Sequence, residues 1–264
     1  MILQKIIDKI ESFAPLSMAC EGDNPGLMFG KKDKEITKVL AALDVDLGVI
    51  REAKEKGADL ILTHHPLMFD PLKQINENSP AGKCLLELAE GNIALYSAHT
   101  NLDSAVGGLN DIFADKLGIS GTHPIAVTYT DENGTEYGIG RVGTLEKETT
   151  LAEFAKVVCT AFDLPSTNFV GDGNSKIKTV GLCSGSGADM LSYKLAEEAD
   201  VFVTGDVKYS HARRFTDLGL NLIVAGHYET EICAMQVFKN ILSSLPVEVV
   251  FSEANKNVFN YTEG

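Results

Sequence analysis

Residues 60–66 read Leu60-Ile61-Leu62-Thr63-His64-His65-Pro66, a short apolar run that ends in two adjacent histidines. An apolar run of this length, bounded by a proline, predicts a buried strand. In α/β proteins, binding sites form outside the carboxyl ends of the strands. The two imidazoles therefore indicate a metal or catalytic site at that edge, because histidine is the commonest metal ligand in proteins.

Three further apolar runs also lead into side chains that bind metals: 93–98 before His99 and Asp103, 201–204 before Asp206 and His211, and 222–225 before His227 and Glu231. Of the six histidines in the chain, only His123 lies outside these predicted strand-end loops. This concentration of a scarce residue strengthens the prediction of one functional site.

Apolar runs and helical patterns alternate along most of the chain. Strands are predicted over 36–43, 59–63, 93–98, 179–183, 201–204 and 222–225, and helices over 47–56, 81–90, 151–161, 189–198 and around Ala212. Around Asp131-Glu132-Asn133-Gly134 the pattern changes to a β-hairpin signal, since short β-prone runs flank an Asn-Gly pair. Alternating strands and helices predict an α/β protein with mostly parallel sheets.

Two stretches of the chain resemble each other. Residues 57–63 match residues 198–204, and in each half the next strand opens with an asparagine, Asn92 or Asn221. Each of these strands closes on a histidine that is followed four residues later by an acid. An internal duplication would explain this, with two α/β domains around a cleft that holds the metal site. We expect one domain over 1–120 with 225–264, and the other over 121–224.

Composition excludes several classes of protein. A net charge of −14 argues against broad nucleic-acid binding. No apolar stretch approaches the roughly 20 residues of a membrane helix, and the first ten residues do not resemble a signal peptide. We therefore expect a cytoplasmic protein. The five cysteines contain no C-x-x-C pair, which favours buried free thiols over a disulfide framework.

The candidate ligands indicate a site with more than one metal ion. Either histidine–acid pair alone could be a surface hydrogen bond, but His64, His65, His227, Asp103 and Glu231 together offer more donors than one tetrahedral zinc uses. We expect two divalent transition-metal ions per chain, and nitrogen and oxygen donors admit Zn, Fe, Mn, Co or Ni. Paired ions that share an activated water are a hydrolytic arrangement.

Three motifs resemble the signatures of the Nif-three-like dinuclear metal family, often labelled GTP cyclohydrolase I type 2 homologues: Thr63-His64-His65-Pro66-Leu67, residues 99–103 and residues 226–231. Residues 24–27, 42–44 and 140–143 extend the resemblance over nearly the whole chain. It implies His64, His65, Asp103, His227 and Glu231 as metal ligands, and a toroidal homohexamer of two interlinked α/β domains.

The resemblance also implies a compact form of the family. Some members carry an inserted domain between the halves, and residues 121–174 are too few to hold it. Two positions depart from the family pattern: Asp206 stands where many members have glutamate, and no proline follows Asn257. Neither position is a ligand in the family set.

His99 and His211 are the candidate catalytic residues. The family ligand set omits His99, so we expect it to orient a ligand or to transfer protons. Asp44, Asp206 and Lys208 are weaker candidates for similar supporting roles. Residues 184–187, Ser-Gly-Ser-Gly between a strand and a helix, would suit either a phosphate site or a simple small-residue turn.

Two functions agree with these observations. The first is a metal-dependent hydrolase of a small molecule, with a nucleotide as one candidate. The family label implies opening of the guanine ring of GTP with release of formate, and phosphoester hydrolysis is the alternative within this class. The second is a non-enzymatic metal-binding hexamer that stores or delivers ions or regulates a partner protein.

Overall fold

The computed structural model describes residues 1–260, which form two compact units. The first unit comprises Met1–Leu102 and Ala234–Val258, and the body of the second is Asp103–Cys233. We expected divisions after residues 120 and 224, whereas the structure groups residues 103–120 and 225–233 with the second unit. Phe113 and Leu117 give a physical reason, since both are buried in the core of that unit.

The first unit is built on a five-stranded sheet with the order β1-β4-β3-β2-β13. Its strands are β1 (Gly26–Phe29), β2 (Lys38–Ala42), β3 (Leu60–Thr63), β4 (Ala94–Ser97) and β13 (Glu248–Phe251). All except the antiparallel β1 run parallel. Ala42 pairs with Thr63, and Thr63 pairs with Ser97. The carboxyl ends of the three central strands therefore lie level, and the residues that follow them share one edge of the sheet.

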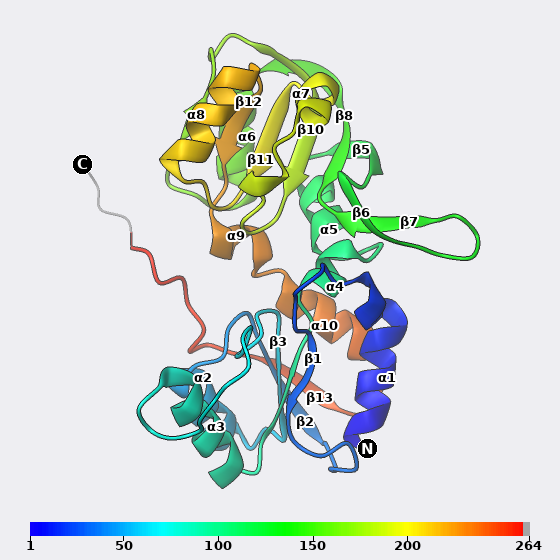
Figure 1. Cartoon of the computed structure of the whole chain (residues 1–264), viewed down its shortest axis with the longest axis vertical. Coiled ribbons are helices and arrows are strands. Elements are labelled where there is room, and N and C mark those ends of the chain that lie inside the picture. The colour runs from blue at the N-terminus through cyan, green and yellow to red at the C-terminus, as the bar shows by residue number, and fades with distance from the viewer. Residues whose placement is uncertain (261–264) are drawn as a thin grey trace. The chain divides into compact units, whose positions relative to one another are not determined.

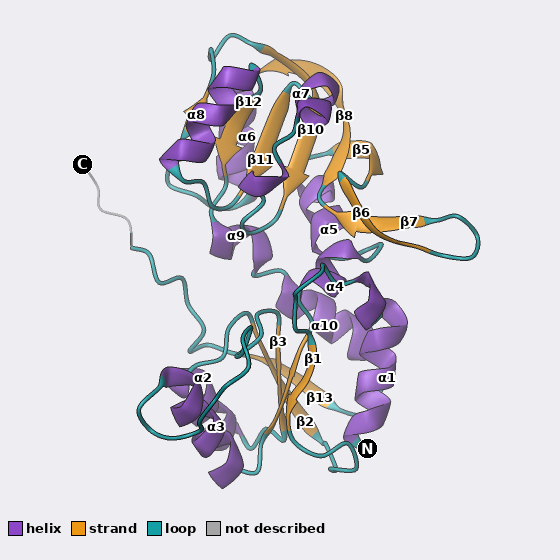
Figure 2. Ribbon diagram, viewed as in Figure 1, coloured by secondary structure: helices purple, strands orange, loops and turns teal. Residues whose placement is uncertain are grey.

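Helices cover both faces of this sheet (Figures 1 and 2). On one side lie α2 (Leu47–Lys56) and α3 (Pro80–Glu90), and on the other α1 (Leu3–Phe13) and α10 (Ala234–Leu242). A short 3-10 turn, η1 (Leu16–Met18), follows α1. Helix α2 begins where the Asp46 carboxylate accepts a hydrogen bond from Val49 N at 2.8 Å, and it ends at Gly57 with φ 64°. These are the usual signals for the start and the end of a helix.

The second unit is built on a six-stranded sheet with the order β5-β8-β10-β11-β12-β9. Its strands are β5 (Ile119–His123), β8 (Arg141–Thr150), β9 (Phe169–Val170), β10 (Lys176–Cys183), β11 (Val201–Thr204) and β12 (Asn221–Val224). The strands β10, β11 and β12 are parallel. The expected hairpin is present as β6 (Ala126–Thr130) and β7 (Glu136–Ile139), which pair in a separate two-stranded sheet.

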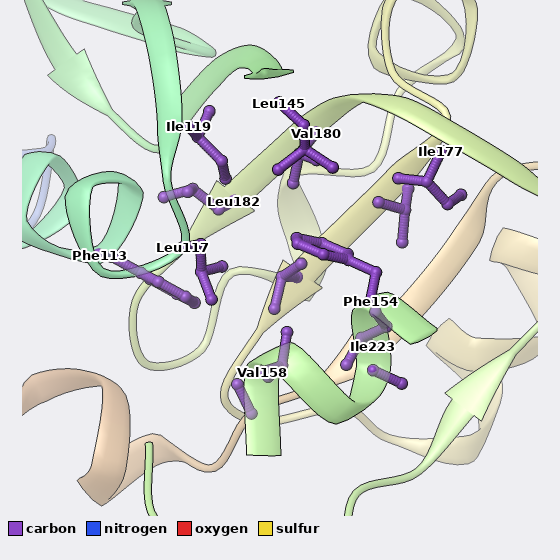
Figure 3. Packing of buried hydrophobic residues seen from close by; sticks show 14 of the residues in the cluster. Phe113, Leu117, Ile119, Leu145, Phe154, Val158, Ile177, Val180, Leu182 and Ile223 are labelled. Atoms are coloured by element: carbon purple, nitrogen blue, oxygen red, sulfur yellow. The ribbon is translucent and has the colours of Figure 1, made fainter. Parts of the chain in front are cut away.

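Helices α5 (Leu109–Lys116) and α6 (Leu151–Ala161) pack on one face of this sheet through the core drawn in Figure 3. There Phe154 and Val158 of α6 meet Val180, Leu182 and Ile223 of the strands. On the opposite face, α7 (Tyr193–Glu198) and α8 (Tyr209–Leu218) cover Phe202 and Leu222. The remaining helices are α4 (Thr100–Ser104) and α9 (His227–Glu231).

The predicted α/β class is confirmed, and most predicted elements lie within a few residues of their expected positions. One helix differs. The helical pattern over 189–198 contains a 3-10 turn, η2 (Ala188–Met190), and α7 starts only at Tyr193. The Ser192 hydroxyl caps α7 by accepting a hydrogen bond from Leu195 N at 3.2 Å, which fixes the later start. No helix among residues 1–260 is long and apolar enough to cross a membrane.

The two similar stretches of sequence adopt the same local structure. One carboxylate oxygen of Asp59 accepts hydrogen bonds from the backbone N–H of residues 37 and 38, and one of Asp200 accepts them from residues 178 and 179. The carbonyl of Thr63 accepts from Ala98 N at 2.9 Å, and that of Thr204 from Ala225 N at 2.7 Å. The repeated residues thus tie each strand to its neighbour in the same way, as a duplication would require.

A buried carboxylate joins the C-terminal chain of the first unit to α2. Glu52 is 9% exposed and accepts hydrogen bonds from the Ser252 hydroxyl and from Glu253 N and Ala254 N, and it pairs with Lys56 at 2.8 Å. Burial raises the pKa of Glu52, but the hydrogen bonds from Lys56, Ser252 and the backbone outweigh it and bring the pKa from 4.5 to about 2. The ionised form is therefore the one that the fold stabilises.

We expect Glu52→Gln to destabilise the protein by about 1–3 kcal/mol at pH 7, because it leaves buried donors without their charged acceptor. A folded pKa below the unfolded value means that the stabilisation is complete above about pH 4.5 and disappears as the pH falls towards 2. Urea unfolding followed by circular dichroism should show the difference between wild type and variant shrinking over that range. Glu248→Gln, at an exposed glutamate, is the control. An equal difference at pH 7 and at pH 3 would contradict the assignment.

Candidate metal centre

Three histidines gather at the carboxyl edge of the first unit's sheet. His64 and His65 follow β3, and His99 follows β4. Their ring centroids lie 5.1 Å apart for His64–His65, 5.1 Å for His64–His99 and 5.6 Å for His65–His99. One potential ligand atom from each ring lies within 4.8 Å of the others. Because β3 and β4 end level, they bring His65 and His99, which are 34 positions apart in the chain, to the same edge of the sheet.

Each of these rings is held through its Nδ1 atom. His64 Nδ1 donates to the carbonyl of Ala98 at 2.8 Å, His65 Nδ1 contacts the Asp44 carboxylate at 2.7 Å, and His99 Nδ1 contacts the Asp23 carboxylate at 2.8 Å. Because these partners only accept hydrogen bonds, each neutral ring carries its proton on Nδ1 and its lone pair on Nε2. His64 is fully buried, including its Nε2 atom. This is the tautomer of a histidine that binds a metal ion through Nε2.

The partner of His99 is a residue that our sequence reasoning missed. The Asp23 side chain is 4% exposed, and it accepts hydrogen bonds from Thr100 N and the Thr100 hydroxyl as well as contacting His99. Burial raises the pKa of Asp23, but the hydrogen bonds from His99, Thr100 and Asn24 N prevail and lower it to about 2. Asp23 therefore stays ionised. In the sequence it lies in a Gly/Pro-rich turn, where an aspartate is expected for turn chemistry alone.

Asp44, a weaker candidate from the sequence, is located at the first unit's site as the partner of His65. Its own position depends on the C-terminal chain. The Asn255 side-chain oxygen accepts hydrogen bonds from the backbone N–H of Leu43 and Asp44, and its amide nitrogen donates to the Asp44 carboxylate at 3.4 Å. The loop after β2 is thereby fixed, and so is the orientation of the His65 ring.

In the second unit, His227 and Glu231 lie on α9, and the i, i+4 spacing places them on one face of that helix. His227 Nδ1 contacts Asp206 at 2.7 Å, and its Nε2 contacts the Glu231 carboxylate at 2.8 Å. The hydrogen bond with Glu231 is the largest cause that raises the pKa of His227 to about 9, followed by burial, which lowers it, and by the charges of Glu231 and Asp206. A proton thus lies between His227 Nε2 and the Glu231 carboxylate, and a metal ion that bound both atoms would have to displace it.

Asp103, the other expected carboxylate ligand, is also in the second unit and is 7% exposed. The Ser184 hydroxyl donates to its carboxylate at 3.3 Å, and the Asn110 amide donates to its backbone carbonyl at 3.1 Å. Asn110 also accepts from Ser184 N at 3.0 Å. The loop after β10 therefore positions Asp103.

Gly185 of this loop leaves room for the Glu231 carboxylate. A Cβ atom on Gly185 would lie 1.9 Å from Glu231 Oε1, and φ at Gly185 is +60°. The backbone N–H groups of Ser184, Gly185 and Gly187 bind Asn110 Oδ1, Thr230 Oγ1 and Thr204 Oγ1 respectively. Since these three donors are used within the protein, the structure favours the small-residue turn over the phosphate site.

The other candidates are not members of these donor groups. His211, on α8, pairs with Asp189 at 3.3 Å and belongs to neither donor group of the described residues. Lys208 is the residue that precedes the first turn of α8. His123 pairs with Glu198 at 2.6 Å on the second unit's surface, which agrees with its isolation in the sequence.

Comparisons with known proteins identify the family of this chain. The family model described as Duf34/NIF3 (NGG1p interacting factor 3) matches residues 1–258. A Clostridium perfringens protein named GTP cyclohydrolase 1 type 2 homolog is 38% identical over 265 residues, covering 99% of this chain and all of that protein. The crystal structure of a Bacillus cereus protein related to NIF3 superposes with a TM-score of 0.89 at 26% identity, covering 99% of both chains.

A longer relative supports the compact form. A Bacillus subtilis GTP cyclohydrolase 1 type 2 homolog is 30% identical, and the match extends over 365 positions against the 264 residues of this chain while covering 98% of each. That protein therefore carries sequence that this chain lacks. With a family model that spans nearly all of it, this chain belongs to the Duf34/NIF3 family.

Proposed function

We propose that this protein is a metal-dependent hydrolase that binds two divalent transition-metal ions per chain through His64, His65, Asp103, His227 and Glu231. The observation that carries the proposal is the shared orientation of the histidines. In His64, His65 and His227, Nδ1 lies 2.7–2.8 Å from an oxygen atom that holds the ring. Nε2 is therefore the ring atom that would bind a metal ion. A purely structural histidine has no need of this repeated arrangement.

The donor set fits such ions. Imidazole nitrogen and carboxylate oxygen without thiolate suit Zn, Fe, Mn, Co or Ni. The two carboxylates are 7% and 4% exposed, and a bound cation would stabilise their negative charge in this buried setting. Bound divalent ions would supply Lewis acidity and an activated water for attack on an electrophilic carbon or phosphorus.

His99, held by a carboxylate, would transfer protons during the reaction. Asp23 holds the Nδ1 proton of His99, so Nε2 of His99 can accept a proton while the resulting positive charge is stabilised by an ionised, buried carboxylate. We propose His99 as the proton-transfer residue and Asp23 as the residue that positions it. His211 remains a second candidate for the same task.

The substrate we propose is a small molecule, with a nucleotide tested first. Relatives that match this chain over its whole length are named as GTP cyclohydrolase 1 type 2 homologs. Hydrolysis of the guanine ring would release formate, and phosphoester hydrolysis would release phosphate. Measuring both formate and phosphate in one assay therefore distinguishes the two reactions.

Protein purified without chelators should contain about two transition-metal ions per chain by mass spectrometry. Glu231→Ala and His65→Ala should each reduce that content to about one ion or less, since each removes a ligand. His123→Ala and Glu148→Gln are the controls, because neither side chain lies in the proposed ligand set. A content near zero that reconstitution does not raise would contradict the metal proposal.

Gly185→Ala should lose metal even though it removes no ligand, because the new methyl group occupies the position of the Glu231 carboxylate. Gly219→Ala is a matched control. Both glycines have positive φ, +60° and +70°, so both variants carry similar backbone strain, but a Cβ at Gly219 has no atom within 4 Å. Equal metal content in the two variants would show that Gly185 does not protect the ligand position.

His99→Ala should reduce turnover by about 10²–10⁴-fold with metal content unchanged, because a positioned acid or base contributes that much to catalysis. Asp23→Asn should reduce it less, since the asparagine amide oxygen can still accept from His99. Formate and phosphate release, measured beside metal content, distinguish catalysis from storage. If His99→Ala alters only metal retention, the non-enzymatic alternative gains support.

A further inference from the structure

The first unit contains a cavity of about 790 Å³. Its apolar lining includes Val45, Leu47, Leu67, Leu72, Ala81 and Cys84. Burial, followed by the charges of Asp46 and Glu87, raises the pKa of the Cys84 thiol, so this group is protonated and adds to the apolar lining. Cavities of roughly 300–1,000 Å³ that are mostly apolar are typical of small-molecule sites.

Two cations line the same cavity, Arg51 from α2 and Lys83 from α3. Across residues 1–260, neither is within ion-pair distance of a carboxylate. The one acid in the lining, Asp46, already accepts a hydrogen bond from Val49 N at 2.8 Å. A cavity with a net positive lining is unexpected in a chain whose net charge is −14.

We propose that this cavity binds a small organic molecule with an apolar body and one anionic group. The apolar residues would cover the body, and Arg51 and Lys83 would pair with the anion. A purely apolar ligand would leave the two cations without a role, and a small inorganic anion would leave the apolar lining exposed to water. The combination of both surfaces selects the amphipathic class of ligand.

The cavity adjoins the metal donors of the first unit along the chain. Leu67 is two residues after His65, and Asp46 is two residues after Asp44, the partner of His65. A molecule bound here lies beside the loops that hold these residues. Identifying it as the substrate rests on the proposed function, whereas binding itself does not depend on the metal.

The probe is 8-anilinonaphthalene-1-sulfonate, which has an aromatic body and one sulfonate, and its uncharged analogue N-phenyl-1-naphthylamine is the matched comparison. Fluorescence titration of the full chain, metal-free and metal-loaded, measures the affinity for both. We expect the sulfonate probe to bind more tightly than the neutral one. Equal affinities would overturn the role of the cations.

Arg51→Gln and Lys83→Gln should each weaken binding of the sulfonate by about threefold, and the double variant by about tenfold, with little effect on the neutral probe. Arg214→Gln and Lys194→Gln change the net charge equally at exposed sites of the second unit and should have no effect. Ala81→Phe, which fills the cavity, should weaken both probes. If the double variant binds the sulfonate as wild type does, the cavity is not the site.

Competition binding experiments then identify which anionic group the cavity prefers. 1-Naphthyl phosphate and 1-naphthoate should displace the sulfonate probe, and the stronger competitor identifies phosphate or carboxylate as the preferred group. Failure of both to displace it would contradict the proposal. Because metal content is measured separately, a wild-type protein that holds two ions but does not bind the sulfonate probe would reject this inference and leave the hydrolase proposal intact.

Discussion

The donor geometry of this protein depends on one repeated interaction, the hydrogen bond between a histidine Nδ1 and an oxygen atom of the neighbouring strand end. It occurs at His64, His65, His99 and His227, with a carbonyl or a carboxylate as the partner. An imidazole that is not held can rotate and change tautomer, and it then presents either nitrogen. Fixing Nδ1 removes both freedoms, so Nε2 is the atom that each ring presents, and at His227 this atom shares a proton with Glu231.

The two units meet this requirement in the same way. In each unit, parallel strands end level, and a carboxylate in the loop after one strand holds a histidine after the next. Asp44 with His65 and Asp206 with His227 have the same separation of 21 residues. A strand–helix–strand repeat sets this separation, because it fixes how much chain lies between neighbouring strand ends. The site therefore follows from the topology of the sheets as much as from the identity of the ligands.

The sequence predicted the α/β class, the hairpin and most elements, because their apolar periodicity and capping residues act locally. It also marked His64, His65, His99, His227 and Asp206 as residues at strand ends. It did not mark Asp23 or Asn255, because each acts on residues far away in the chain: Asp23 holds His99, and Asn255 holds Leu43 and Asp44 across 211–212 positions. The role of Gly185 was also hidden, since a glycine between a strand and a helix suits a phosphate loop and a close-packed turn equally well.

The hydrogen bonds from Leu43 N and Asp44 N to Asn255, which is far away in the sequence, have a consequence for folding during synthesis. The loop that orients His65 is held by Asn255, which follows the body of the second unit in the sequence. Strand β13, which completes the first sheet, is also synthesised after the body of the second unit. A ribosome therefore releases the second unit in a state that can fold before the first unit has its last strand. During that interval β2, the strand that pairs with β13, has an open edge. The loop at Asp44, and with it the His65 ring, reaches its final orientation only after the body of the second unit has been synthesised.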